Sequence, residues 1–384
     1  MHYREEIDGL RALAVLPVIL FHAGLFGFSG GFVGVDIFFV ISGYLITTII
    51  IEEKKNDKFS IVSFYERRFR RILPAVTIVL IVSTLASYIL LPANLLKSYS
   101  QSLVSVSTFT SNVFFFLTNG YFSSASDEKI LLHTWSLSVE EQYYLFFPLM
   151  VVGFWSLGKV KFALLILTLT ISSLFLAHYL SVNNYQDLNF YLIFSRAWEL
   201  FFGSLLAVKK APLLKLSHLN KNLLGVLGLG LIIYSMLFYD KYTPFPSLYT
   251  LVPVLGAVLV ISFADTTSLT GKLLSNKSLI HIGLLSFSLY LWHQPIFAFL
   301  RLKSIGEPGM FEFAIAILIT YMLSLLSYRY IETPFRNKKS FSRSKIFKLS
   351  ALSIIFFTVV GLSGHFFKGF PERFSEQQYE ESIT

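Results

Sequence analysis

Residues 11–22 read RALAVLPVILFH, an uninterrupted apolar run with a guanidinium at one end and an imidazole at the other. Ionisable side chains inside a membrane span are costly and usually face a bundle interior or a water-filled cavity. Arg11 and His22 are close to three helical turns apart, so they fall within about 20° of one stripe, roughly 16 Å apart along the axis. The spacing suits a ligand lying along the helix, with an anionic part near Arg11 and a reactive atom near His22. A snorkelling Arg and an unrelated, hydrogen-bonded His explain the same pattern equally well.

The composition around this run indicates an all-α integral membrane protein. Hydrophobic residues make up 54% of the 384 residues and charged residues only 14%, against roughly a quarter in soluble domains. The chain has no cysteine, which excludes disulfides, thiolate catalysis and Cys-based metal sites, and we predict no metal centre. The net charge of +9 arises from basic residues clustered in a few short loops, so membrane topology explains it and no nucleic-acid partner is predicted.

Eleven apolar runs are long enough to span a membrane. They lie near residues 8–27, 32–51, 72–92, 138–157, 162–180, 190–208, 222–239, 247–263, 279–300, 311–330 and 345–366. The Ser- and Thr-rich stretch 95–118 is ambiguous, but if it crossed, the basic loops KKAPLLKLSHLNK and RNKKSFSRSK would face outward. The positive-inside rule therefore predicts a re-entrant or interfacial element there, with the N-terminus cytoplasmic and the C-terminal tail outside.

The second run begins GGFVGVDIFFVISGYLI, residues 30–46. Gly30, Gly31 and Gly34 permit a tight turn and a close backbone approach as the chain re-enters the membrane. Asp36 lies at a depth comparable to that of His22, where a carboxylate would orient an imidazole and raise its basicity. A structural pairing of Asp36 with another buried donor is the alternative.

The stretch FYERRFRRILP, residues 64–74, holds four arginines in two Arg-x-x-Arg pairs. The i,i+3 spacing places each pair on one helix face, and guanidinium groups suit phosphate oxygens. Such a face would grip a nucleotide-bearing cosubstrate. Taken alone, a positive-inside anchor among anionic lipid headgroups is the more frequent explanation.

Before the fourth run comes LLHTWSLSVEEQYYLFFP, residues 131–148. Ser138 and Glu141 have the spacing of a capping box, which predicts a helix start there. Capping does not explain His133, Trp135 and Glu140, which are residue types that a carbohydrate-facing loop uses for stacking and hydrogen bonding.

Three further ionisable residues fall inside predicted spans. Arg196 and Glu199 in SRAWELFFG are i,i+3 neighbours and can neutralise one another. His293 in FSLYLWHQPIF lies in the outer half of its span. We assign all three to the substrate cavity without individual roles, and a purely structural Arg196–Glu199 pair is the alternative.

These motifs in this order, closed by YIETPFR, make the chain resemble the acyltransferase 3 family over roughly residues 3–337. The resemblance implies a bundle of about ten transmembrane helices in residues 1–337. Residues 338–384 would then form a basic linker, an eleventh transmembrane helix and a short extracytoplasmic tail.

Members of this family resemble bacterial inner-membrane enzymes that move an acyl group, often acetyl, from cytoplasmic acyl-CoA to a hydroxyl of an extracytoplasmic glycan or lipid-linked saccharide. The resemblance implies that His22 is catalytic, with Asp36 beside it, and that acetyl-CoA is the cosubstrate. It also implies that a set of arginines meets the donor's phosphates: Arg11, Arg67, Arg68, Arg70 and Arg71. Lipopolysaccharide O-antigen is the expected acceptor, held by His133, Trp135, Glu140, Glu141 and the cavity residues.

Some members continue into an extracytoplasmic SGNH-type domain, and the span at 345–366 followed by GFPERF resembles the start of that arrangement. The expected partner is therefore an SGNH-type domain removed from this chain or supplied by a separate protein. Two rival functions remain open. One is a transporter or flippase of an acyl or sugar carrier, with the buried charges as a proton relay. The other is a non-catalytic scaffold anchored in membrane lipids.

Overall fold

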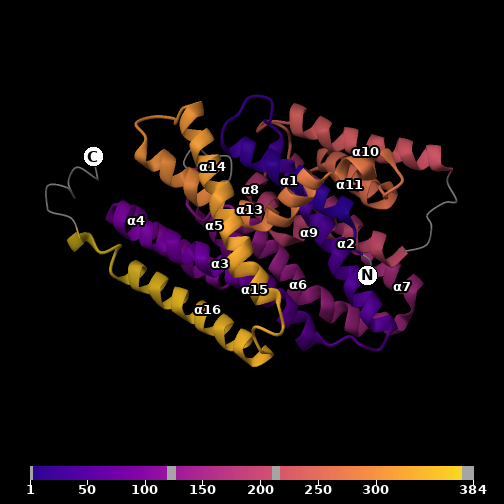
Figure 1. The fold of residues 1–384 in the computed structure, drawn as a ribbon, viewed down its shortest axis with the longest axis horizontal. Coiled ribbons are helices and arrows are strands. Elements are labelled where there is room, and N and C mark those ends of the chain that lie inside the picture. Colours follow the sequence, from indigo (N-terminus) through magenta and orange to yellow (C-terminus); the bar gives the residue numbers. More distant parts are fainter. Residues whose placement is uncertain (1–2, 119–126, 210–216, 374–384) are drawn as a thin grey trace. The chain divides into compact units, whose positions relative to one another are not determined.

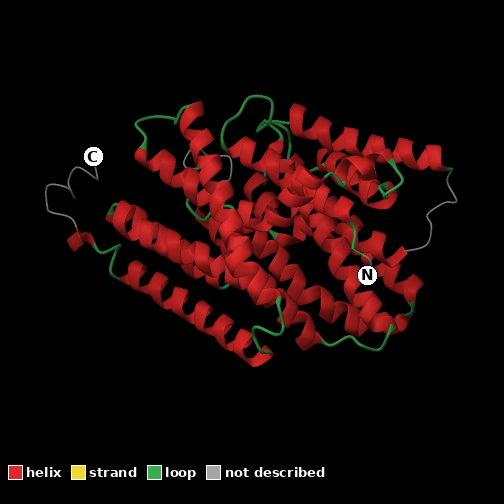
Figure 2. Cartoon of the chain, viewed as in Figure 1, coloured by secondary structure: helices red, strands yellow, loops and turns green. Residues whose placement is uncertain are grey.

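The computed structural model describes residues 3–118, 127–209 and 217–373. These residues form helices joined by loops and turns, and none of them lies in a strand (Figures 1 and 2). The predicted all-α fold is confirmed. Parts of the predicted loops at 119–137 and 209–221, and most of the C-terminal tail, lie outside the described residues.

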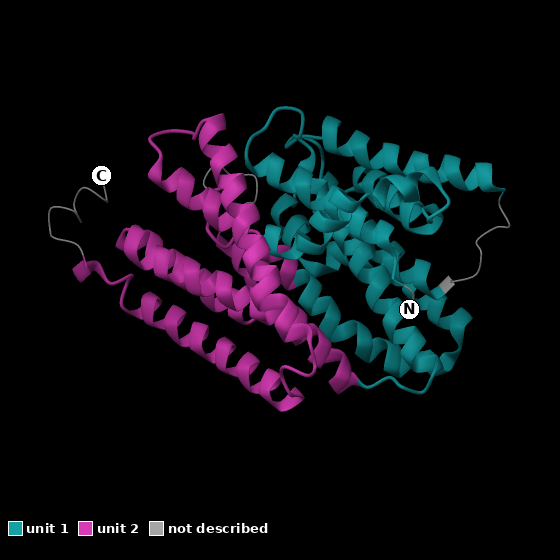
Figure 3. Ribbon diagram, in the orientation of Figure 1, with its two compact units in different colours: residues 1–60, 120–122, 139–290 teal, residues 61–119, 123–138, 291–384 magenta. Residues whose placement is uncertain are grey.

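The chain divides into two compact units (Figure 3). Unit 1 comprises residues 1–60, 120–122 and 139–290, and unit 2 comprises residues 61–119, 123–138 and 291–384. The division falls within two helices, so unit 2 includes the start of α6 and the end of α13.

Unit 1 holds most of the helices. They are α1 (Glu5–His22), η1 (Gly31–Val33), α2 (Gly34–Lys55), α6 (Thr134–Phe154), η3 (Trp155–Leu157), α7 (Lys159–Val182), α8 (Gln186–Tyr191), α9 (Ile193–Lys209), α10 (His218–Phe238), η4 (Leu248–Thr250), α11 (Leu251–Phe263), α12 (Leu269–Leu274) and α13 (Lys277–Lys303). Its main helix pairs are α2 with α9, α7 with α9, and α10 with α11. At the α2–α9 crossing, a Cβ on Gly43 would overlap the carbonyl oxygen of Leu200, and one on Gly203 would overlap that of Val40. Small residues therefore let these two backbones touch, as is common between transmembrane helices.

Unit 2 is built around one long helix. Its elements are α3 (Ile61–Leu90), α4 (Ala93–Ser107), α5 (Ser111–Thr118), α14 (Met310–Ser327), the π-helical turn η5 (Tyr328–Glu332), α15 (Thr333–Arg336), α16 (Arg343–Phe366) and η6 (Pro371–Arg373). Helix α16 packs along α4 and α3. The eleventh predicted span is thus an integral part of this unit. The domain boundary at residue 337 stays a prediction.

Eight segments among the described residues are long and apolar enough to cross a membrane. They are Gly31–Lys55, Ile61–Leu90, Lys159–Val182, Gln186–Val208, His218–Phe238, Lys277–Lys303, Met310–Arg336 and Arg343–Phe366. Each of the eleven predicted spans overlaps a helix, but the count of eleven is not confirmed. Helix α1 carries four charged residues among its eighteen, and the apolar helix at Leu248–Phe263 is short.

The ambiguous stretch 95–118 forms two short helices, α4 and α5, separated at residues 108–110. Neither is among the spanning segments. A break of this kind suits an element that does not cross, and the membrane side on which it lies stays a prediction.

Candidate functional site

His22 is the last residue of α1 and is buried in unit 1. Its Nδ1 lies 2.9 Å from the carbonyl oxygen of Val18, one turn earlier. A carbonyl can only accept, so Nδ1 carries a proton, and in the neutral form of the ring the lone pair lies on Nε2. His22 therefore has the tautomer and the fixed ring position that a general base or a nucleophile requires.

Two glycines set the position of α1 against the chain that follows it. A Cβ on Gly31 would overlap the carbonyl oxygen of Pro17, and one on Gly34 would overlap that of Ala14. Both glycines have ordinary negative φ angles, so space rather than backbone strain demands them. The close backbone approach predicted from the GGFVG sequence is confirmed, and it packs α2 against the half of α1 that ends in His22.

The structure gives Asp36 a different partner from the predicted one. Asp36 Oδ1 accepts a hydrogen bond from Nη2 of Arg196 at 2.8 Å, and both side chains are fully enclosed. The predicted contact between Asp36 and the His22 imidazole is not made, so the catalytic role expected for Asp36 loses its geometric basis. The physical reason is that a buried guanidinium offers a carboxylate a stronger partner than a neutral imidazole does.

Arg196 also pairs with Glu199, as the i,i+3 spacing predicts, with Nη1 and Oε1 3.3 Å apart. Aromatic rings surround its guanidinium at 5.5–5.6 Å from the ring centroids, namely those of Phe39, Phe190 and Phe245. The result is a closed cluster of one cation, two carboxyl groups and three rings, which we call the Arg196 cluster. Cation–π contacts of this kind are strongest where water is excluded.

Arg11 lies in the first half of α1, about three turns before His22, and is half-buried. Its Nη1 donates to Asp8 Oδ1 at 2.8 Å, while the Tyr3 hydroxyl donates to Asp8 Oδ2 at 2.7 Å. The acidic partner Asp8 was missed, although its i,i+3 spacing to Arg11 was visible in the sequence.

The predicted capping box at the start of α6 is wrong. The helix begins at Thr134, so Ser138 and Glu141 lie inside it, and the Ser138 hydroxyl bonds to that of Ser111 at 2.7 Å. Glu140 is half-buried in unit 1, where its carboxylate accepts hydrogen bonds from Ser42 at 2.7 Å and from Tyr144 at 3.3 Å. Glu141 thus does not play the helix-start role that its spacing from Ser138 suggested.

His133 and His293 come together in unit 2, with ring centroids 5.6 Å apart at an angle of 71°. Both rings are buried, and so is Trp135, which is 2% exposed. The Trp135 ring is thus not open to a sugar at the surface, and the stacking role stays a prediction. The placement of the two histidines in one cluster was not predicted.

The four arginines of α3 in unit 2 differ in their surroundings. Arg70 is buried and donates to Glu66 Oε1 from both Nε and Nη2, at 3.0 and 2.9 Å. It also donates to the carbonyl oxygens of Phe335 and Phe341 at 3.1 and 2.7 Å. Its guanidinium is therefore used within the fold, which disfavours a phosphate-binding role that stays a prediction.

Among the other three, Arg68 is buried with its guanidinium over the Phe64 ring, whereas Arg67 and Arg71 are half-buried. Within the described part of the chain, Arg71 has no hydrogen-bond or ion-pair partner. Of the predicted basic face, only Arg67 and Arg71 are thus partly open to solvent.

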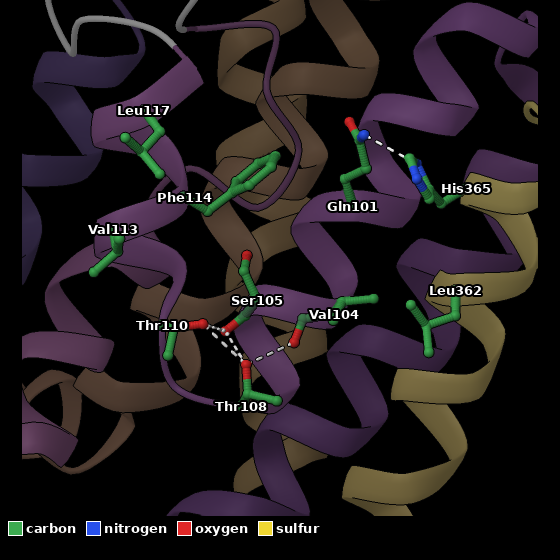
Figure 4. Close-up of a pocket in the computed structure, with 10 residues that line it drawn as sticks. All are labelled: Gln101, Val104, Ser105, Thr108, Thr110, Val113, Phe114, Leu117, Leu362 and His365. Atoms are coloured by element: carbon green, nitrogen blue, oxygen red, sulfur yellow. Dashed lines mark hydrogen bonds between the residues drawn. The ribbon is translucent and has the colours of Figure 1, made fainter.

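A pocket of about 410 Å³ lies among α4, α5 and α16 (Figure 4). Its walls are apolar, formed by side chains such as Val104, Phe114 and Leu362, with a hydrogen bond of 3.0 Å between Gln101 Nε2 and His365 Nδ1. None of the site residues predicted from the sequence lines this pocket.

A family model described as an acyltransferase domain matches residues 4–329. The chain belongs to this acyltransferase family. The resemblance drawn from the sequence motifs is confirmed. No solved structure matches the chain.

Two acyltransferase relatives show what the chain is similar to. The peptidoglycan O-acetyltransferase OatA of Listeria monocytogenes is 33% identical over 364 residues, which cover 90% of this chain and 58% of that protein. The O-acetyltransferase OatA of Staphylococcus aureus is 33% identical over 394 residues, covering 95% of this chain and 64% of that protein. The chain therefore spans less than two thirds of the length of these relatives.

Proposed function

We propose that the protein is a membrane-bound O-acetyltransferase that moves an acetyl group to a hydroxyl of a cell-wall glycan. Membership of the acyltransferase family and the names of its relatives support this reaction class. The observation that carries it is the buried His22, whose Nδ1–H is held by the Val18 carbonyl. Since the Listeria relative is named a peptidoglycan O-acetyltransferase, we favour peptidoglycan over the O-antigen acceptor expected from the sequence.

In the proposed reaction, His22 Nε2 removes the proton of the sugar hydroxyl as this oxygen attacks the thioester carbonyl. The carbon–sulfur bond then breaks, and the coenzyme A thiolate leaves and takes up that proton. Alternatively, Nε2 attacks the thioester first and the thiolate leaves; the sugar hydroxyl then takes the acetyl group from Nε2, and its proton passes to the thiolate. In both routes the ring becomes positively charged, and the Nδ1–H bond to the Val18 carbonyl stabilises that charge. General-base assistance of this kind contributes roughly 10²–10⁴ in rate.

Acetyl-CoA is the proposed donor, with its phosphates near the half-buried arginines of α3, Arg67 and Arg71. We place the protein in the cytoplasmic membrane with its N-terminus inside. The free energy for transfer would then come from a cytoplasmic thioester while the acceptor lies outside. An extracytoplasmic SGNH-type domain or protein remains a proposed partner.

The test is acetyl transfer by the purified protein in proteoliposomes, with radiolabelled acetyl-CoA inside and peptidoglycan fragments outside. We expect His22→Ala to reduce label transfer by about 10²–10⁴, with an unchanged thermal unfolding midpoint. His218→Ala removes an exposed histidine of the same unit and is the matched control. Near wild-type transfer by His22→Ala would remove His22 from the mechanism. Movement of glycan without label transfer would favour the transporter.

A further inference from the structure

A second, smaller pocket of about 260 Å³ lies in unit 2. It is smaller than the roughly 300–1,000 Å³ typical of drug-sized ligands, so it suits a single ring or group. Its wall combines hydroxyls, aromatic rings and one charge of each sign: Ser98, Ser102, Phe114, Phe115, Glu128 and Lys129. Apolar faces with a few placed polar groups are the usual make-up of a small-molecule site.

Lys129 is the feature that gives this pocket its chemistry. Its Nζ lies 5.6 Å from the centroid of the Phe115 ring, and the side chain is half-buried. In the described part of the chain, no carboxylate forms an ion pair with it. Burial lowers the pKa of the ammonium group to about 8. A partly desolvated cation without a counter-ion is unfavourable by itself and becomes favourable when an anion arrives.

The backbone of Lys129 is fixed from outside its own loop. Gln294 of α13 is fully buried, and its Nε2 donates to the carbonyl oxygens of Lys129 and Asp127 at 3.0 and 3.2 Å. The next residue back, His293, contacts the His133 ring at the far end of the same loop. The loop is therefore held by α13 at both ends, and Lys129 is positioned before any ligand binds.

We propose that this pocket binds a carboxylate or phosphate group carried by the saccharide acceptor, with Lys129 as its counter-ion. The proposal deepens the proposed function and rests on it, because it names the chemical class of the acceptor. Lys binds oxyanions as a point charge, which tolerates either group. The Ser102 hydroxyl donates to the Tyr99 carbonyl, so its oxygen can accept a hydrogen bond from a sugar hydroxyl. The exposed Glu128 can accept another.

The pocket predicts a pH dependence whose sign follows from Lys129. The ammonium is charged below about pH 8 and neutral above it, so affinity for an anionic sugar should fall as the pH rises through 8. At pH 9 only about a tenth of the molecules carry the charge, which predicts roughly tenfold weaker binding. Two other titratable groups line the pocket. They are Glu128 and Tyr99, and burial raises the pKa of Tyr99, so its phenol stays neutral.

The test is binding of D-glucuronate, D-glucose 6-phosphate and neutral D-glucose by calorimetry, using the full chain in nanodiscs of zwitterionic lipid without donor. We expect both anionic sugars to bind about tenfold or more tightly than glucose at pH 7, and Lys129→Met to abolish that preference. Lys97→Met is the matched control, since Lys97 lies on α4 but does not line the pocket. Lys129→Arg should keep the preference at pH 9.5, where the wild type loses it.

Three results would overturn the proposal. One is equal binding of glucose and the two anionic sugars by the wild type, and another is an unchanged preference in Lys129→Met. The third comes from labelling Lys129 with an amine-reactive reagent in nanodiscs with and without phosphatidylglycerol. If phosphatidylglycerol protects Lys129 and neither anionic sugar does, the pocket belongs to a lipid headgroup. The sugar-binding measurement contains no acetyl-CoA, so it can be interpreted even if the His22 test shows no acetyl transfer. If transfer stands while the sugar preference is absent, the pocket assignment alone fails.

Discussion

The Arg196 cluster of unit 1 and the Lys129 pocket of unit 2 hold a positive charge in opposite ways. Arg196 has two carboxyl groups within 3.3 Å and three aromatic rings around its guanidinium, and it is 1% exposed. Lys129 has a single ring beneath its ammonium and an open space in front of it. Arg196 thus has ion-pair partners within the fold, whereas Lys129 faces a cavity.

The difference separates charges that hold the protein together from charges that remain available to a ligand. Burying a charge is costly unless it is paired, so a cation with two buried carboxyl partners gains less from an anionic ligand than a cation with none. The sequence assigned Arg196 and Glu199 to the substrate cavity. Their pairing with Asp36 instead favours a structural role. Substitutions at the Arg196 cluster should therefore change the stability of the protein, whereas substitutions at the Lys129 pocket should change ligand binding.

The largest effect is expected at Arg196. Arg196→Met removes the cation and leaves the buried carboxyl groups of Asp36 and Glu199 without it, so we expect a loss of about 3–5 kcal/mol in the free energy of unfolding. Thermal unfolding in detergent measures it, with Arg301→Met in unit 2 as a comparison arginine on α13. Wild-type stability in Arg196→Met would mean that the cluster is not structural and would break the contrast.

An intermediate effect is expected within the arginine face of α3. Arg70→Ala should cost about 1.5–3 kcal/mol, because the charged hydrogen bonds to Glu66 and to two carbonyl oxygens are lost. Arg71→Ala should change stability by less than about 0.5 kcal/mol and weaken acetyl-CoA binding by up to about fivefold. Unfolding curves and donor titrations on both variants separate these outcomes. The opposite assignment, with Arg70→Ala stable and Arg71→Ala unstable, would contradict the structure.

The smallest effect on stability is expected at Lys129. Lys129→Met removes a cation that the described residues do not pair, so the free energy of unfolding should change by no more than about 0.5 kcal/mol. Gln294→Leu should be more destabilising than Lys129→Met, because two carbonyl oxygens lose their donor. Thermal unfolding of both variants, without chemical denaturant, measures which of them loses more stability. A large loss of stability in Lys129→Met would place this residue with Arg196 and remove the distinction between the two regions.

Local features of the fold were predictable from the sequence because their causes are local. Apolar runs predicted the helices, the i,i+3 spacing predicted the Arg196–Glu199 pair, and GGFVG predicted the close approach to α1. The capping box failed because the helix starts four residues before Ser138. Residues 131–133 form a turn, and α6 begins directly after it at Thr134.

Most of the site's contacts were out of reach for a different reason. Asp36 and Arg196 are 160 residues apart, and Arg70 meets the carbonyl oxygens of Phe335 and Phe341 from more than 260 residues away. Nothing in the local spacing encodes which distant partner a buried charge selects. The sequence therefore predicts which residues could take part in chemistry, while only the fold shows which of them already have partners within the protein.

The glycine contacts on α1 have a consequence for how the chemistry can diversify. A Cβ on Gly31 or Gly34 would stand 2.1 Å from the carbonyl oxygen of Pro17 or Ala14, with the side chains of Phe21 and Val18 the next nearest groups, so both glycines help to set the position of α1 and of His22 at its end. If His22 is the reactive residue, as proposed, other side chains around it can change shape while these contacts keep the end of α1 in place. On the proposed function, new acceptors could be accommodated by changes in the lining residues. A single methyl group at either glycine, in contrast, would move α1 and with it the His22 imidazole.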